Sequence, residues 1–368
     1  MNNSHPYQDC IRSLQEQMKL KDVDLVSIAP TANMRYLTGF APHLDERFCS
    51  LLISQESYRF VVPELNADQV EAHTGMSVIR WSDTQGPEYA LETALRGLGT
   101  STGIVLAADD SMRADYLLRV QDALLPSKSI PAGVLISSLR VIKSPEEIQT
   151  LSQAAALADR AMAVGIEACQ PGASERQAAY KIAAYFMENG AQNVDFTIVA
   201  SGPNGAFPHH EVSDRVMQTG DTVILDIGAT FKDYKSDITR VVHLGEPPQE
   251  VLDVYSAVLK ANQAGIAAAL AGGKARQIDH AARASLGNDG LGEYFVHRTG
   301  HGLGMEGHEP PWITSTSETI LESGMVFSVE PGVYLPGKFG VRIEDIVTVT
   351  DDGCRVLTGF NHELVINE

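Results

Sequence analysis

The sequence predicts two domains: an α/β domain over residues 1–140 and an α+β domain with an internal pseudo-two-fold repeat over residues 141–368. Three observations support this prediction. Helix-like and strand-like runs alternate at short intervals up to about residue 140. Two long helical patterns with capping signals follow directly. From there, the order helix, helix, strand with an acid, strand with an acid occurs twice.

The overall composition is that of a globular chain long enough to bury a sizeable core. Its 368 residues are 44% hydrophobic and 20% charged, which suits about two domains. The 47 acidic residues outnumber the 28 basic ones, for a formal net charge of -19. Because nucleic acids and anionic membranes bind to basic faces, we expect neither as a partner.

Cysteine usage and the N-terminus predict a cytoplasmic protein. The four cysteines are widely spaced and form no Cys-x-x-Cys pair, so neither a disulfide framework nor a thiolate zinc site is expected. The N-terminal MNNSHPYQDC lacks the basic-then-apolar pattern of a signal peptide. No apolar run approaches the roughly 18 residues of a membrane span.

In the N-terminal domain, short strand-like and helix-like runs alternate. The predicted strands cover residues 23–29, 48–53, 59–62 and 103–107. The predicted helices cover residues 10–20, 66–73, 87–98 and 111–125. No dense polar cluster accompanies them. Residues 33–36 and 43–47 could reach an active site, but we interpret them first as ordinary turn and surface residues.

The second domain begins with two capped helices. Ser144 and Glu147 have the spacing of a capping box, with Pro145 at the first helical position. A second capping box follows at Ser174 and Gln177, and a glycine ends that helix. We therefore place the domain boundary near residue 140.

The first acid pair lies within TVILDIGATFKDYKSDITR, residues 222–240. Asp226 interrupts an apolar, β-branched run, and Asp237 follows eleven residues later in a second strand-like run. If the two runs pair as a hairpin, both carboxylates can lie on one face. Buried together, they would repel each other and lose hydration unless a cation or a proton compensates them. This pair alone leaves a metal site and a proton-sharing dyad open.

The same order of elements returns later in the chain. Helical patterns over 249–271 and 276–286 precede Glu330, which follows a glycine by six residues, as Asp226 does. A second hairpin then introduces Glu344. A duplicated half would bring all four carboxylates to the centre of one domain.

Four clustered carboxylates cannot be a proton-sharing dyad, because most of their charge would remain uncompensated. Two divalent cations would neutralise them, and acidic oxygens suit Mn²⁺, which we expect first, or Co²⁺ or Zn²⁺. Such a site usually recruits a nitrogen ligand. The candidates are His297, His301 and His308, three histidines in a glycine-rich segment of twelve residues.

Other histidines divide into two groups. His209 and His210 precede the first acidic strand, and at least one of them is placed to enter the same cavity. His243, His280 and His362 have no comparable setting and are interpreted as surface or capping residues.

Several motifs together resemble the pita-bread metallopeptidases. These motifs are PHHEVSDRV, LDIG, SDITR, HRTGHGLGMEGHEPP, SVEPGVY and GVRIED. The family holds Xaa-Pro dipeptidases (prolidases), aminopeptidases P and methionine aminopeptidases, with creatinase as a metal-free relative. The resemblance covers residues 140–368, and the N-terminal α/β domain resembles the creatinase-type domain of prolidases and aminopeptidases P. Methionine aminopeptidases generally lack that domain and fit less well.

The resemblance implies a role for each matching residue. It implies that two metal ions are held by Asp226, Asp237, His301, Glu330 and Glu344, with Asp237 and Glu344 bridging the ions. It implies that the substrate is contacted by His209, His297 and His308, and that Arg342 orients this region. All five ligands are present, which disfavours the metal-free branch. Relatives with this N-terminal domain are often dimers, so a homodimer is expected.

The implied chemistry is hydrolysis of a Xaa-Pro bond in dipeptides or short peptides. Two neighbouring metal ions would convert a bridging water into hydroxide near neutral pH. His209 or His308 would polarise the scissile carbonyl, and Glu330 would carry the proton to proline's nitrogen.

One position departs from the pattern of some prolidases. There, an arginine that holds the free proline carboxylate follows the His-Glu-x-Pro segment, whereas this chain has Trp312. No other residue can be identified from the sequence as a replacement. The expectation is therefore that Xaa-Pro-Yaa tripeptides are cleaved at least as well as Xaa-Pro dipeptides.

Two alternatives remain open. A hydrolase of a small non-peptide amide, such as an ectoine-type solute, would keep the same ligands and change only the pocket. A catalytically silent module that binds protein partners would usually lose metal ligands, and this chain retains all five.

Overall fold

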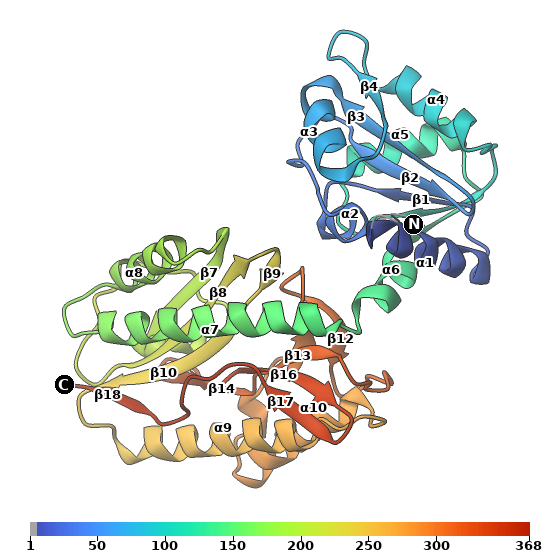
Figure 1. Cartoon of the computed structure of the whole chain (residues 1–368). Coiled ribbons are helices and arrows are strands. Elements are labelled where there is room, and N and C mark those ends of the chain that lie inside the picture. Colours follow the sequence, from blue (N-terminus) through green and yellow to red (C-terminus); the bar gives the residue numbers. More distant parts are fainter. Residues whose placement is uncertain (1–5) are drawn as a thin grey trace. The chain divides into compact units, whose positions relative to one another are not determined.

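The structure is a computed structural model that describes residues 6–368. The first five residues, which form half of the N-terminal segment considered above, lie outside the described residues. The chain divides between Arg140 and Val141 into two compact units (Figure 1). No helix within the described range combines the length and the apolar composition that crossing a membrane requires.

The N-terminal unit is built on a mixed sheet, in which Figure 1 labels β1 to β4. The full strand order is β4-β3-β2-β1-β5-β6. Its strands are β1 (Leu25–Ile28), β2 (Ser50–Ser54), β3 (Tyr58–Pro63), β4 (Val78–Trp81), β5 (Val105–Ala108) and β6 (Lys128–Pro131). The sequence predicted the four inner strands but missed β4 and β6. Both lie at an edge of the sheet and are mostly not fully buried, so they lack a clear apolar pattern.

Helices cover both faces of this sheet. They are α1 (Pro6–Leu20), α2 (Ala32–Thr38), α3 (Glu64–Thr74), α4 (Glu88–Gly97), α5 (Ala114–Leu124) and α6 (Gly133–Arg140). Successive residues of β2 point to opposite faces, so that Leu51 joins one core cluster and Leu52 the other. The first cluster contains residues of α1, α2, α3 and α6, and the second contains residues of α4 and α5.

In the second unit, a pair of helices followed by a sheet occurs twice. Its helices are α7 (Pro145–Ala168), α8 (Glu175–Glu188), α9 (Gln249–Ala267) and α10 (Ala275–Asn288), with short 3-10 turns η1 (Gly202–Ala206) and η2 (Gly292–Tyr294). The first sheet contains β7 (Asn193–Ser201), β8 (Thr222–Phe231), β9 (Tyr234–Lys235), β10 (Ile238–Leu244) and β18 (Val365–Asn367). The second contains β11 (Gly300–Gly302), β12 (Glu309–Ile313), β13 (Val326–Val329), β16 (Asp345–Thr350) and β17 (Gly353–Val356). A separate ribbon pairs β14 (Gly332–Leu335) with β15 (Phe339–Arg342).

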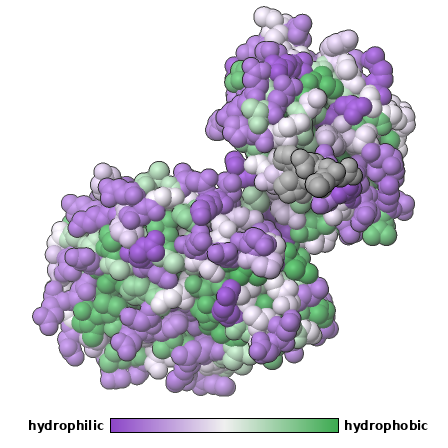
Figure 2. Space-filling view, in the orientation of Figure 1, coloured by the Kyte–Doolittle hydropathy of each residue, from purple (hydrophilic) through white to green (hydrophobic). Residues whose placement is uncertain are grey.

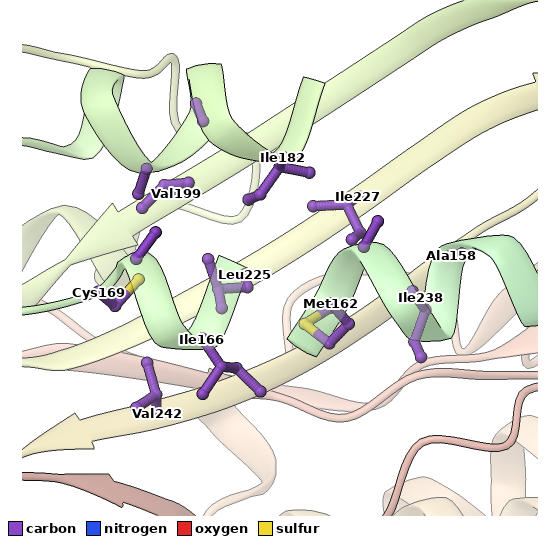
Figure 3. Packing of buried hydrophobic residues seen from close by; sticks show 14 of the residues in the cluster. Ala158, Met162, Ile166, Cys169, Ile182, Val199, Leu225, Ile227, Ile238 and Val242 are labelled. Carbon is purple, nitrogen blue, oxygen red and sulfur yellow. The ribbon is translucent and has the colours of Figure 1, made fainter. Parts of the chain in front are cut away.

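Apolar faces of the helices hold the first half of this unit together. Met162 and Ile166 of α7 and Ile182 of α8 belong to the same buried cluster as Leu225 of β8 and Ile238 of β10 (Figure 3). The visible surface, in contrast, is largely hydrophilic, with smaller apolar patches between the polar side chains (Figure 2). One face of the sheet therefore packs against helices, which leaves the Asp226 carboxylate of β8 on the other face.

Both predicted capping boxes are present. Ser144 accepts a hydrogen bond from the backbone of Glu147, and the Glu147 carboxylate accepts one from the backbone of Ser144. Ser174 and Gln177 make the same reciprocal pair at the start of α8. These boxes set the start of the helix pair immediately after the boundary between the units.

Replacing Ser144 with alanine should lower the free energy of unfolding by about 1 kcal/mol, because one helix N–H loses its side-chain acceptor. Urea unfolding followed by circular dichroism measures this loss. The same replacement at Ser174 should have an effect of similar size. Unchanged unfolding midpoints in both variants would contradict the capping role.

Candidate functional site

One pocket of the second unit brings together all the site residues predicted from the sequence. It has a volume of about 290 Å³. Its lining includes His209, Asp226, Asp237, His297, His301, His308, Glu330, Arg342 and Glu344. These residues come from both halves of the repeat, so the pocket lies where the halves meet.

The first acid pair is positioned by strand pairing between β8 and β10. Asp226 lies within β8 directly opposite Thr239 of β10, and Asp237 precedes β10. Side chains two residues apart on a strand share a face, so Asp237 and Thr239 project to the same side. The predicted hairpin is present, and Asp226 and Asp237 both line the pocket.

The second acid pair lies at strand ends rather than within strands. Glu330 directly follows β13 and Glu344 directly precedes β16, and these two strands pair antiparallel. A bridge between Thr239 and Glu344 joins the halves, and the Thr239 hydroxyl donates a 2.7 Å hydrogen bond to Glu344 Oε2. The repeat thus places its second pair of carboxylates beside the first.

His301 on β11 directs its imidazole at these acids. Its Nδ1 lies 3.1 Å from the Gly302 carbonyl oxygen, which can only accept a hydrogen bond, so Nδ1 carries the hydrogen. Nε2 lies 3.2 Å from Glu330 Oε1 and 3.9 Å from Asp237 Oδ2. In the neutral ring, the Nε2 lone pair therefore faces two carboxylates. A cation between them would satisfy all three groups.

The electrostatics of the pocket are those of crowded, buried acids. Burial, followed by the charge of Glu344, raises the pKa of Asp237 well above its usual value. Burial, followed by the charge of Glu330, raises the pKa of Glu344 in the same way. Burial also raises the pKa of Glu330, but the contact with His301 and the charges of His297 and Arg342 together outweigh this effect and lower that pKa to about 2.

The ligand atoms fit divalent metal ions. Asp237, His301 and Glu344 each offer one ligand atom, and these atoms lie within 4.8 Å of one another. Asp226 Oδ1 is buried and has no hydrogen-bond partner among residues 6–368. An acceptor-only oxygen that is cut off from water is costly unless a cation meets it. Carboxylate oxygens with one imidazole nitrogen suit Mn²⁺, Co²⁺ or Zn²⁺.

Arg342 on β15 holds one side of the pocket in place. Its guanidinium donates to Asp226 Oδ2 at 2.5 Å, to the Tyr334 hydroxyl at 2.8 Å and to the Pro208 carbonyl at 3.2 Å. The Tyr334 hydroxyl also lies 2.8 Å from His297 Nε2. Arg342 thereby orients a carboxylate and, through Tyr334, a histidine.

His209 and His308 lie at the exposed side of the same pocket. The Arg298 guanidinium donates to His308 Nδ1 at 3.4 Å, which leaves the hydrogen on Nε2. Partial burial of the ring, and then the charges of His301 and Arg298, lower the pKa of His308 to about 4. His308 is therefore a neutral hydrogen-bond donor near pH 7.

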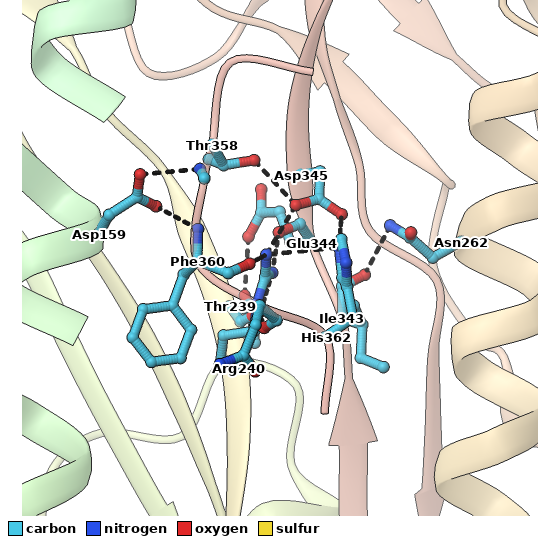
Figure 4. A network of polar contacts seen from close by, with 12 residues as sticks. Asp159, Thr239, Arg240, Asn262, Ile343, Glu344, Asp345, Thr358, Phe360 and His362 are labelled. Carbon is cyan, nitrogen blue, oxygen red and sulfur yellow. Dashed lines mark hydrogen bonds and ion pairs between the residues drawn. The ribbon is translucent and has the colours of Figure 1, made fainter. Parts of the chain in front are cut away.

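A buried polar network supports the backbone around Glu344 (Figure 4). Arg240, which is almost fully buried, donates to the Glu344 carbonyl at 2.6 Å and to Asp345 Oδ1 at 2.8 Å. Asn262 donates to the Ile343 carbonyl at 3.4 Å. The residues on both sides of Glu344 are thus anchored, which limits the movement of its carboxylate.

The histidines outside the pocket have structural contacts. His210 bonds to Glu175 at 2.8 Å, so of the two adjacent histidines only His209 lines the pocket. The interpretation of His243 as a surface or capping residue is wrong: it is fully buried and lies 3.1 Å from the Thr222 hydroxyl. Its position in a strand whose two faces are both covered explains the difference.

Sequence reasoning missed several residues of the pocket and its supports. Phe196 and Ile198 form an apolar wall from β7, and Ile198 pairs directly opposite Asp226. Thr239 could have been found, because it lies two residues after Asp237 on the same strand face. Tyr334 and Arg298 carried no local signal, since only the tertiary fold brings them to the site.

Comparison with known families gives two matches that together span most of the chain. A model described as metallopeptidase family M24 matches residues 149–351. A model described as the creatinase/prolidase N-terminal domain matches residues 11–142.

Individual relatives agree with these matches. A Mycobacterium tuberculosis protein named "Probable dipeptidase PepE" is 40% identical over 347 residues, which are 92% of this chain and 91% of that protein. A Pyrococcus horikoshii protein named "Xaa-Pro dipeptidase" is 33% identical over 96% of this chain and 98% of its own length. The crystal structure of a prolidase from Thermococcus sibiricus aligns with a TM-score of 0.93 at 38% identity, covering 99% of this chain and 100% of that one.

Proposed function

The chain belongs to metallopeptidase family M24, with a creatinase/prolidase N-terminal domain, and from this premise we propose that it hydrolyses the Xaa-Pro bond of dipeptides or short peptides. The observation that carries the proposal is the single pocket in which five potential metal ligands and three histidines meet. Relatives named as dipeptidases favour a peptide over a small non-peptide amide as the substrate.

We propose that two divalent ions are held by Asp226, Asp237, His301, Glu330 and Glu344. The unpartnered Asp226 Oδ1 and the close ligand atoms of Asp237, His301 and Glu344 support this assignment. Bound ions would supply Lewis acidity and a nucleophilic hydroxide near neutral pH. Mn²⁺ is the proposed native metal, with Co²⁺ or Zn²⁺ as substitutes, because carboxylate oxygens predominate among the ligands.

The chain's own groups would then bind, polarise and protonate the substrate. The Nε2–H of His308 is placed to donate to the scissile carbonyl oxygen, with His209 as a second donor from the same side of the pocket. Glu330 would take a proton from the attacking water and pass it to proline's nitrogen as the C–N bond breaks. Arg342 would hold these catalytic groups in place. It bonds to the Tyr334 hydroxyl, which in turn contacts His297.

The apolar wall suits the proline ring. Phe196 and Ile198 line the pocket beside the carboxylates, and Ile198 lies opposite Asp226 in the sheet. An apolar wall alone discriminates by only about 1–3 kcal/mol per methylene. Selectivity therefore also needs a polar contact to one end of the substrate.

Location and assembly complete the proposal. The four cysteines, all within the described residues, form no disulfide, which supports a reducing cytoplasm. A homodimer is proposed from the resemblance to dimeric relatives, and exposed apolar side chains such as Leu65 and Leu118 are available for an interface.

The purified protein loaded with Mn²⁺ should release free proline from Ala-Pro and leave Ala-Ala almost intact. Chromatographic detection of the products over time measures both reactions under the same conditions. Separate samples loaded with Co²⁺ or Zn²⁺ control for the case in which Mn²⁺ does not support activity. The proposal fails if no Xaa-Pro peptide is cleaved with any of the three metals, or if Ala-Ala is cleaved equally well.

A further inference from the structure

A second arginine lines the candidate active site. Arg298 directly follows His297 and is half-buried in the pocket wall. Its guanidinium carbon lies 4.6 Å from the centre of the Trp312 ring. Trp312 is the residue that stands where some prolidases have an arginine, so the stacked pair places a guanidinium beside that position.

No carboxylate of the described residues neutralises the charge of Arg298. Among the described residues it forms no ion pair with a carboxylate, and its one hydrogen bond, to His308 Nδ1, is long at 3.4 Å. Arg342, the other arginine of the pocket, is occupied by Asp226, Tyr334 and Pro208. A half-buried guanidinium without an acid partner in a pocket of acids requires a separate explanation.

The Arg298 guanidinium lies over the Trp312 ring, a contact that does not use its N–H donors. A guanidinium that packs its flat face on an indole ring keeps its N–H donors in the plane of the group. The edge that carries these donors matches the two oxygens of a carboxylate, which it can bind through two parallel hydrogen bonds. The Trp312 ring also restricts the rotamers of Arg298, so less entropy is lost when a ligand binds.

We propose that Arg298, held by Trp312, binds the C-terminal carboxylate of a Xaa-Pro dipeptide. The inference rests on the proposed function and deepens it, since it names the end of the substrate that is recognised. It reverses the expectation drawn from Trp312 alone: dipeptides should be cleaved better than Xaa-Pro-Yaa tripeptides, whose proline carboxylate is tied up in a peptide bond.

The test compares Ala-Pro with its C-terminal amide, Ala-Pro-NH₂, which removes only the negative charge at that end. In the unaltered protein, kcat/KM should be higher for the acid. In Arg298→Met, which keeps the length of the side chain but loses its charge, the ratio of kcat/KM for acid over amide should fall by about 10- to 100-fold. In Arg298→Lys the ratio should be partly retained.

A matched control uses Arg355, an exposed arginine on β17. Arg355→Met should leave the acid-to-amide ratio unchanged. The inference is overturned if Arg298→Met lowers turnover of acid and amide equally, or if it affects only peptides with an acidic first residue. If neither the acid nor the amide is cleaved by the unaltered protein, it is the proposed function that fails.

A binding measurement provides a readout that does not depend on turnover. The chain has two tryptophans, so in a Trp81→Phe background the fluorescence reports on Trp312. Titration with free proline should change this fluorescence, whereas prolinamide should have little effect. Adding Arg298→Met should raise the proline concentration needed for the half-maximal fluorescence change by about 10-fold or more. Equal responses to proline and prolinamide would also overturn the inference.

Discussion

Stripping divalent metal from the protein with a chelator is expected to abolish peptide hydrolysis and to lower the melting temperature. Asp237 and Glu344 are buried beside Asp226 and Glu330, and without cations their charges are uncompensated. Turnover should fall by at least about 10³-fold, since a bound metal contributes several kcal/mol to charge stabilisation in the transition state. A metal at about 100 times its dissociation constant adds about 2.7 kcal/mol, so the melting temperature should fall by about 5–10 °C.

The chelation experiment combines enzyme assays with differential scanning fluorimetry before and after dialysis. Adding back Mn²⁺, Co²⁺ or Zn²⁺ separately should restore both signals and rank the metals. A protein whose activity and melting temperature are the same with and without chelator would contradict the metal assignment. Loss of activity without any change in melting temperature would contradict the claim that the ions compensate buried charge.

The candidate ligands could be predicted from the sequence because their signals are local. Asp226 stands out as an acid inside an apolar run, and Asp237 lies at hairpin distance from it. Glu330 and Glu344 repeat that pattern in the same order of elements. The helix starts at Ser144 and Ser174 follow from capping boxes, which depend on residues only three positions apart.

Other features depend on contacts that no local pattern contains. Arg298 and Trp312 are stacked because β11 and β12 pair antiparallel, which places the residues around His301 opposite Trp312. Tyr334 reaches His297 only through the ribbon of β14 and β15. His243 is buried because other strands and helices cover both faces of β10. Each of these facts requires the tertiary structure.

The two halves of the repeat also differ in a way that sequence reasoning did not anticipate. The first half holds Asp226 within β8, where Ile198 on one side and Thr239 on the other fix its position. The second half places Glu330 and Glu344 at strand ends, next to the ribbon that carries Arg342. Strand pairing on both sides therefore fixes Asp226, whereas the backbone at Glu344 is held by added supports such as Arg240 (Figure 4).

Replacing Asp237 and His308 separately should distinguish metal binding from substrate activation. Asp237 offers a ligand atom close to His301 and Glu344, so Asp237→Ala should lose bound metal together with activity. His308 lies at the exposed side of the pocket, so His308→Ala should keep its metal and lose about 10²–10³-fold in kcat, the cost of removing one donor to the developing oxyanion. Metal content by mass spectrometry and steady-state kinetics measure the two effects.

Both variants should fold, which makes the comparison decisive. Removing the Asp237 carboxylate relieves repulsion among buried acids, and His308 is exposed. His280→Ala is a matched control, because that histidine is exposed on α10 and, in the described part of the chain, its ring bonds to the Ser315 carbonyl alone. It should retain both metal and turnover. Equal loss of metal from Asp237→Ala and His308→Ala would refute the division of roles, since it would make His308 a ligand as well.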